Sequence, residues 1–322
     1  MTITRRALAG ASLGAIAAPR IAHAAWPADR AIEVVVPFPP GGGVDIMTRA
    51  FLPYLQARLP GARFVVNNRG GAGGQVGAEA IANAAPDGYT IGASSMPGFV
   101  SIPIERATRY QPAAMTLLAN VVDDPCAIAV RANSPIRTLA DFIAAARARP
   151  ETVTFATTGI GSDDHLAMLA FEGLTNTQVV HVPFTGMPQL LPQVLSGTVD
   201  VAALNVSEAL QPVRDGQLRC IAQAGATRWA QMPDVPTYRE QGVDLVASAS
   251  RGLSAPGGLP APIREQLEAA CRAALEDPAF IADAERLGMP LRPIIGAEYR
   301  SFVLDIEARY RVLWQQKPWR DR

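Results

Sequence analysis

The residues best placed to do chemistry are three consecutive glycines, Gly41 to Gly43, which follow a β-branched run over residues 32–36. Such a run favours a buried parallel strand. From Val44 onward apolar residues recur at three- and four-residue spacing, which predicts a helix. The free N–H groups at the start of a helix attract an anion. Glycine turns of this kind also serve only to reverse the chain, so an anion site and a structural turn both stay open at this point.

A second group contains the residue types of a hydrolase triad: Ser162, Asp163, Asp164 and His165. A catalytic triad is assembled from distant segments, however, and the motif G-x-S-x-G is absent from the sequence. Ser162 as the cap of a helix, with acidic residues in its first turn, explains the same residues through the free N–H groups and the helix dipole. We therefore predict that the protein is not an enzyme.

Cofactor and metal motifs are also missing. The run Gly41 to Gly43 is not G-x-G-x-x-G, and no G-K-[ST] follows it. His165 and His181 have no cysteine or second histidine at ligand spacing. The three cysteines show no C-x-x-C spacing, so buried free thiols are the default and a bridge between Cys126 and Cys220 is the alternative. We expect no cofactor and no metal site.

The first residues have the pattern of an export signal. Arg5-Arg6 precede an apolar, small-residue run over 7–18, and Ala22-His23-Ala24 has the small-x-small form of a signal-peptidase site. We predict a signal peptide over residues 1–24, cleaved near Ala24, and a periplasmic location. The arginine pair also fits a twin-arginine signal, so general and twin-arginine export both stay open.

The composition describes a globular protein without a nucleic-acid partner. Of 322 residues, 49% are hydrophobic and 18% are charged, and the length suggests about two domains. Removing the signal takes Arg5, Arg6 and Arg20 from the 29 basic residues, which leaves 26 against 29 acidic residues and a net charge of −3. Basic residues form no run, which argues against nucleic acid or an anionic membrane as partner.

Strands and helices alternate along the chain in two α/β units, which predicts mostly parallel sheets with crossover helices. A longer apolar stretch over 117–130 suits a strand that leaves one unit and enters the other, and the tail over 262–314 is expected to be mainly helical. Ligands in such sheets collect at the carboxyl ends of the strands. The predicted strands are 32–36, 63–67 and 89–93 in the first unit and 153–156, 179–182, 199–204 and 218–222 in the second.

A series of short motifs follows along nearly the whole mature chain. The opening motif is Pro37-Phe38-Pro39-Pro40-Gly41-Gly42-Gly43-Val44-Asp45. Further motifs follow in order: Asn68-Arg69-Gly70-Gly71-Ala72-Gly73-Gly74, Pro86-Asp87-Gly88-Tyr89-Thr90, Thr158-Gly159-Ile160-Gly161-Ser162 with His165, His181-Val182-Pro183-Phe184-Thr185-Gly186, Gly197-Thr198-Val199-Asp200 and Pro233-Asp234-Val235-Pro236-Thr237. Together these motifs resemble one family, the Bug-type substrate-binding proteins of tripartite tricarboxylate transporters (TctC-like).

The resemblance implies a two-lobed α/β fold of the periplasmic-binding-protein type II, in which each lobe is a mostly parallel sheet flanked by helices. Crossing strands would form the hinge. On this basis we expect residues 25–125 and 251–322 to form lobe 1 and residues 126–250 to form lobe 2. The protein is expected to be a monomer.

The resemblance also implies a site where loops of both lobes grip a ligand carboxylate through main-chain N–H groups, hydroxyls and bridging waters. A side chain at Gly42 is expected to block this approach. The residues carried over to this chain are Phe38, Pro39, Gly42, Gly43, Asp45, Ser94, Ser95, Met96, Thr158, Gly159, Gly161, Ser162, His165, Phe184, Thr185, Gly186 and Asn205.

Two departures from the family pattern bear on the ligand. The family often has Tyr-Lys-Gly where this chain has Phe184-Thr185-Gly186, and it often has a Glu where this chain has Asn67. The loss of a lysine and a phenol hydroxyl changes which ligands leave a polar group unpaired. We therefore expect a less polar carboxylate, such as an aromatic acid.

The leading interpretation is a receptor that captures a small organic acid between its lobes and delivers it to the permease subunits of a tripartite transporter. One alternative is a periplasmic ligand sensor that presents its closed form to a membrane signalling protein. A third interpretation, an exported hydrolase, is the least favoured by the residues.

Overall fold

The structure is a computed structural model that describes residues 26–316, 318 and 319. The predicted signal peptide, residues 1–24, and its cleavage site near Ala24 lie outside the described residues. Among the described residues, none of the helices combines the length and the apolar character that spanning a membrane requires.

The first lobe is built around β1 (Ile32–Val36), which pairs in parallel with β2 (Phe64–Asn68) on one side and β3 (Thr90–Met96) on the other. The predicted alternation of strands and helices is confirmed here. The crossover helices are α1 (Gly43–Ala57), α2 (Gln75–Ala82) and α3 (Gly98–Glu105), with a short 3-10 helix at Ala72–Gly74.

The second lobe is built around β5 (Thr154–Thr157), which pairs in parallel with β6 (Val180–Pro183) and β7 (Val201–Asn205). A further strand, β8 (Leu218–Gln223), is antiparallel to β4. The helices of this lobe are α4 (Leu139–Ala148), α5 (Asp163–Thr175), α6 (Met187–Ser196) and α7 (Val206–Arg214), and a 3-10 helix follows at Arg239–Gln241.

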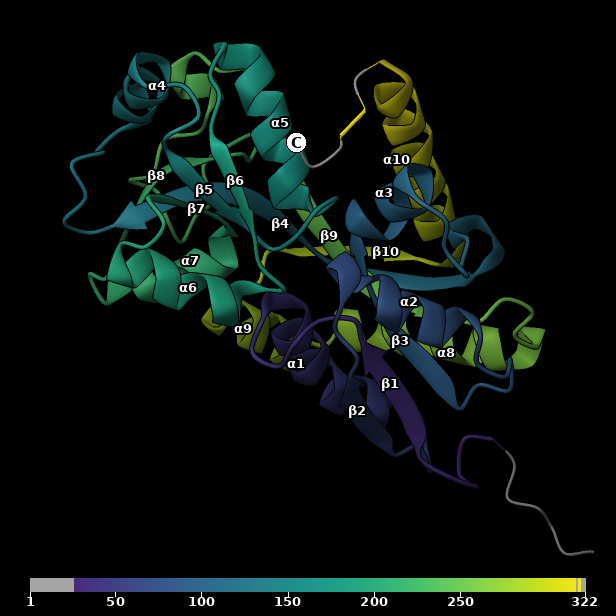
Figure 1. The fold of residues 1–322 in the computed structure, drawn as a ribbon. Helices are drawn as coiled ribbons and strands as arrows, with labels where there is room; N and C mark the ends of the chain where they lie inside the picture. Colours follow the sequence, from purple (N-terminus) through teal and green to yellow (C-terminus); the bar gives the residue numbers. More distant parts are fainter. Residues whose placement is uncertain (1–25, 317, 320–322) are drawn as a thin grey trace, which may run out of the picture.

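Two antiparallel strands connect the lobes: β4 (Thr116–Arg131) and β9 (Ser248–Ala255). The partner of β4 changes along its length, because residues 116–125 pair with β9 whereas residues 126–131 pair with β7 and β8. Figure 1 shows β4 and β9 running between the two groups of helices. The two sheets therefore share one continuous strand, and the lobe boundaries given above stay a prediction.

The end of the chain returns to the first lobe. It contains α8 (Ala261–Leu275), α9 (Pro278–Arg286), β10 (Leu291–Ile295) and α10 (Gly296–Gln316). The predicted helical tail is confirmed apart from β10, which adds an antiparallel strand to β4. A 3-10 helix at Pro112–Ala114 precedes β4.

Each lobe has its own apolar core, which keeps the lobe rigid. In the first lobe Phe51 of α1 and Phe280 of α9 meet edge to face, with ring centroids 5.1 Å apart. In the second lobe Phe142 of α4 stacks between Phe155 of β5 and Phe171 of α5, at 5.9 and 5.2 Å. Close-packed cores of this kind move as units, so we expect motion between the lobes to be concentrated where β4 and β9 pass from one lobe to the other.

Candidate functional site

A cavity of about 40 Å³ lies between the lobes, at the carboxyl ends of six strands. Turns after β1, β2 and β3 line it from the first lobe, turns after β5, β6 and β7 line it from the second, and β9 contributes one side chain. Strand ends are where α/β sheets bind ligands. The lining residues are Phe38, Pro39, Gly42, Gly43, Val44, Gly73, Ser95, Gly98, Thr158, Ser162, Asp163, Gly186, Met187, Pro188, Asn205, Glu208 and Arg251.

The two lobes touch each other around this cavity. The Gly43 N–H at the start of α1 donates to Oε1 of Glu208 on α7 over 2.9 Å. The Ser101 hydroxyl on α3 donates to the Gly161 carbonyl before α5 over 2.7 Å. Sites for small molecules are commonly about 300–1,000 Å³, so the lobes must separate before a metabolite can enter.

Two helices, α1 and α6, have their N-termini at the cavity, and neither N-terminus has a side-chain cap. Their N-cap residues are Gly42 and Gly186, which have no side-chain oxygen to accept from the free N–H groups. The predicted helix start after Gly42 is present, and the Glu208 carboxylate accepts the Gly43 N–H. That an anion binds there stays a prediction. The first turns of α1 and α6 can bind an anion when that contact opens.

Arg251 of β9 carries the buried positive charge of the site. Its Nη1 lies 2.5 Å from Oδ2 of Asp124 on β4, and its Nη2 lies 2.5 Å from Oδ1 of Asn205 and 4.0 Å from Oε1 of Glu208. Burial raises the pKa of Asp124 to about 6, while Arg251 and hydrogen bonds from Ser207 oppose the rise. Asp124 is therefore ionised at neutral pH and pairs with Arg251.

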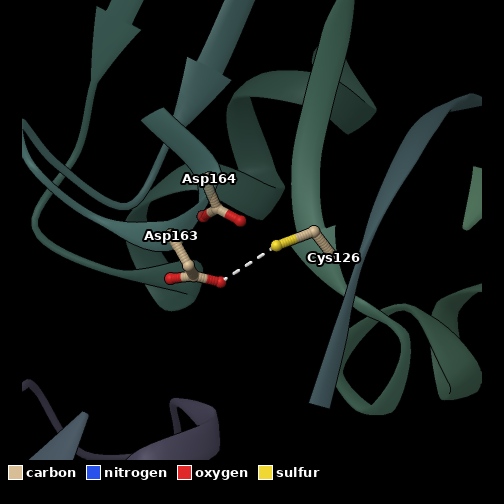
Figure 2. A group of neighbouring side chains, drawn as sticks. All are labelled: Cys126, Asp163 and Asp164. Carbon is tan, nitrogen blue, oxygen red and sulfur yellow. Dashed lines mark hydrogen bonds between the residues drawn. The ribbon is translucent and has the colours of Figure 1, made fainter. Parts of the chain in front are cut away.

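Cys126, Asp163 and Asp164 form a group with one ligand atom of each within 4.8 Å of the others. Asp163 lines the cavity, and the other two residues lie outside its lining. Figure 2 shows the Cys126 thiol pointing to Asp163, and it donates to Oδ2 over 3.3 Å. Burial, together with the Asp163 carboxylate, raises the pKa of Cys126 well above its usual value. Since a metal requires the thiolate, this group is better explained as a hydrogen-bonded cluster than as a metal centre.

The two histidines of the described chain lie against each other. The rings of His165 and His181 stack with centroids 4.3 Å apart. Nδ1 of His165 accepts the Gly161 N–H over 3.0 Å, and Nε2 of His181 lies 2.6 Å from the Thr157 hydroxyl. The pair supports the turn before α5 and does not line the cavity.

Nine of the predicted site residues line the cavity: Phe38, Pro39, Gly42, Gly43, Ser95, Thr158, Ser162, Gly186 and Asn205. The other eight lie outside its lining: Asp45, Ser94, Met96, Gly159, Gly161, His165, Phe184 and Thr185. These eight residues lie in the turns that line the cavity or next to residues that line it.

Physical reasons place several of these eight elsewhere. Side chains alternate along a strand, so Ser95 reaches the cavity while Ser94 turns away and bonds to the Tyr299 hydroxyl at 2.9 Å. Asp45 accepts from Gly41 and Arg49, both over 2.9 Å, and so braces its own turn.

A larger cavity of about 380 Å³ lies against α10 and the residues that lead into β9, and Met96 lines it. None of the other predicted site residues reaches it. It lacks the converging helix starts of the smaller cavity.

Eight lining residues were not among the predicted ones: Val44, Gly73, Gly98, Asp163, Met187, Pro188, Glu208 and Arg251. Asp163 stood next to a predicted residue and was interpreted only as a helix-dipole partner. Glu208 lies three residues after Asn205, the spacing of a capping pair. Arg251 has no local signal, because its partners lie far away in the sequence.

Residues 55–317 match the sequence model of the tripartite tricarboxylate transporter family receptor, TctC. The chain belongs to the TctC family. It is 33% identical to protein BugT of Bordetella pertussis over 296 residues, which are 90% of this chain and 89% of that protein.

Solved structures of TctC relatives have the same fold. The periplasmic binding protein BugD superposes with a TM-score of 0.85 at 25% identity, over 91% of this chain and 99% of that one. MatC of Rhodopseudomonas palustris, solved with bound malate, superposes with a TM-score of 0.80 at 26% identity, over 88% of this chain and 98% of that one. The predicted α/β periplasmic-binding-protein fold and the prediction of a binding protein rather than an enzyme are confirmed.

The crowding at Gly43 generates a testable contrast with Gly42. A Cβ added at Gly43 would lie 2.5 Å from Nη1 of Arg251, whereas one at Gly42 would meet nothing closer than 3.8 Å. Crowding by the protein's own atoms is therefore severe at Gly43 and absent at Gly42, and the block of ligand approach at Gly42 stays a prediction. We expect Gly43→Ala to lower the free energy of unfolding by about 1–3 kcal/mol through overpacking. Gly42→Ala is the matched control and should change it by less than about 0.5 kcal/mol in urea unfolding; equal effects would contradict the geometry.

Removing the charge of Asp124 should destabilise the protein strongly. Asp124→Asn leaves the buried Arg251 without its closest counter-charge, which commonly costs about 3–5 kcal/mol. The control is Asp244→Asn, because the Asp244–Arg239 pair is exposed by 79% and 52% and such pairs contribute less than about 1 kcal/mol. Urea unfolding of both variants at pH 7 measures the difference. A loss at Asp124 as small as that at Asp244 would refute the role of the pair.

Proposed function

We propose that this TctC protein captures a small carboxylate-bearing metabolite in the cavity between its lobes and delivers it to the permease subunits of a tripartite transporter in the membrane. The observation that carries the proposal is the convergence of two uncapped helix starts, α1 and α6, on one cavity reached from both lobes. Helix starts favour carboxylates.

The family and its relatives support the same class of ligand. MatC, a relative of similar fold, was solved with malate. The cavity of this chain also offers the hydroxyls of Ser95 and Ser162, which suit a carboxylate or a bridging water. The Thr158 hydroxyl already donates to Oδ2 of Asp164 over 2.8 Å.

Capture would work through the equilibrium between separated and touching lobes. A ligand that contacts both lobes only when they are together shifts this equilibrium by its differential affinity. The Glu208–Gly43 hydrogen bond joins the lobes across the α1 start. A ligand carboxylate at the neighbouring N–H groups would add to this link or replace it. The permease would then recognise the closed form, with export to the periplasm supplied by the predicted signal.

A thermal-shift screen of residues 25–322 against mono-, di- and tricarboxylates, amino acids and aromatic acids tests the proposal. A ligand that binds only the native state should stabilise it by about 2.7 kcal/mol at a hundredfold excess over its Kd. We expect at least one carboxylic acid to raise Tm and, in small-angle X-ray scattering, to reduce the radius of gyration. Each compound should be recovered unchanged.

Two results would contradict the proposal. One is the absence of any stabilising acid in the panel, and the other is conversion of the acid during incubation, which would favour a hydrolase. Uptake of the acid after deletion of the partner permease separates transport from sensing, because a sensor would leave uptake intact.

A further inference from the structure

The negative charges around the cavity outnumber the positive ones. Three of them line it, Asp163, Glu208 and Arg251, and the positive charge of Arg251 is already paired with Asp124 at 2.5 Å. One cation thus faces three carboxylates. A plain di- or tricarboxylate would add further negative charge beside Asp163 and Glu208, and like charges in a poorly hydrated site repel strongly.

Asp163 is the carboxylate with the least compensation. Its Oδ2 accepts from two neutral donors, the Asn205 amide over 2.9 Å and the Cys126 thiol over 3.3 Å. In the described part of the chain, none of the ion pairs within 4.0 Å includes Asp163, and none of the hydrogen bonds ends on its Oδ1. Glu208, by contrast, holds the N–H groups of Gly43 and Asn205.

Two buried atoms next to this carboxylate lack partners. Asp164 is 1% exposed, lies beside Asp163 (Figure 2), and its Oδ1 accepts no hydrogen bond from the described residues. Nε of Arg251, in a side chain that is 4% exposed and lines the cavity, has no acceptor there. Arg251 and Asp163 line the cavity, whereas Asp164 lies outside its lining. The unpaired donor of Arg251 and the weakly compensated carboxylate of Asp163 match a ligand that carries both an anionic and a cationic group.

We propose that Asp163 binds a protonated amine of the ligand, so that the preferred substrate is an amino-carboxylic acid rather than a plain hydroxy- or dicarboxylic acid. The proposal rests on the function proposed above, since the carboxylate of the same ligand would bind at the helix starts. Oδ1 of Asp163 is the acceptor. The amine would neutralise the excess negative charge of the cavity.

Matched pairs of acids test the proposal directly. Isothermal titration calorimetry of residues 25–322 compares L-aspartate with L-malate, L-glutamate with L-2-hydroxyglutarate, and L-2-aminoadipate with L-2-hydroxyadipate. Within a pair only the amine and the hydroxyl differ. We expect the amino member of the pair that fits the cavity to bind about tenfold to a hundredfold more tightly, as a charge-assisted hydrogen bond to a carboxylate would provide.

Asp163→Asn keeps the shape of the side chain and removes its charge, so the preference for the amino member should fall to less than about threefold. Asp305→Asn is the matched control, because Asp305 is exposed on α10 and the same charge is lost far from the cavity. Circular dichroism and thermal unfolding check that both variants fold. The comparison within the wild-type protein needs no variant at all.

Each outcome decides between the two proposals. If the hydroxy member binds as tightly as the amino member in the wild-type protein, the amine site is refuted and the carboxylate receptor stands. If the preference survives in Asp163→Asn, the assignment to Asp163 is refuted. If neither these pairs nor plain dicarboxylates such as succinate and adipate bind, the proposed function itself is refuted.

Discussion

The buried charge of Arg251 is the constraint on which the site depends. Its side chain comes from β9, and its partners come from β4, through Asp124, and from the junction of β7 and α7, through Asn205. A buried guanidinium is tolerated only when its charge and its donors are matched. The pairing therefore fixes the register of the two crossing strands and holds the start of α7 against them. Because α7 carries Glu208, the same constraint places the carboxylate that reaches Gly43 in the other lobe.

This arrangement separates what must stay fixed from what must move. Asp124 and Arg251 lie on paired strands and are both almost fully buried, so we infer that their contact survives when the lobes rotate. The Glu208–Gly43 and Ser101–Gly161 hydrogen bonds join one lobe to the other, and separation breaks them. Each contributes only about 1 kcal/mol, or somewhat more for the charged acceptor. Links of this size can be broken thermally, as a receptor that opens and closes requires.

Local patterns were enough to predict the repeating strand, turn and helix units and the turns that meet at the cavity. The nine predicted residues that line the cavity came from the family resemblance. The apolar stretch over 117–130 also predicted the long strand β4. The sequence could not show why Asp124 is acceptable inside that strand, since the charge that pairs with it is 127 residues away. It also could not tell Ser95 from Ser94, because the face of β3 that meets the cavity is set by packing against Tyr299. Long-range partners, rather than local propensity, decided these cases.

The same reason changes the expectation for the ligand. The absence of a lysine at Thr185, where the family often has one, suggested a less polar acid. The structure places Thr185 outside the cavity lining and brings Arg251 there from β9, so a cation is present although its local motif is missing. Three carboxylates surround that cation, and one of them, Asp163, has no cation of its own among the described residues within 4.0 Å. Polarity at this site is therefore a property of the assembled cavity, and the balance of its charges constrains the ligand more closely than any single motif does.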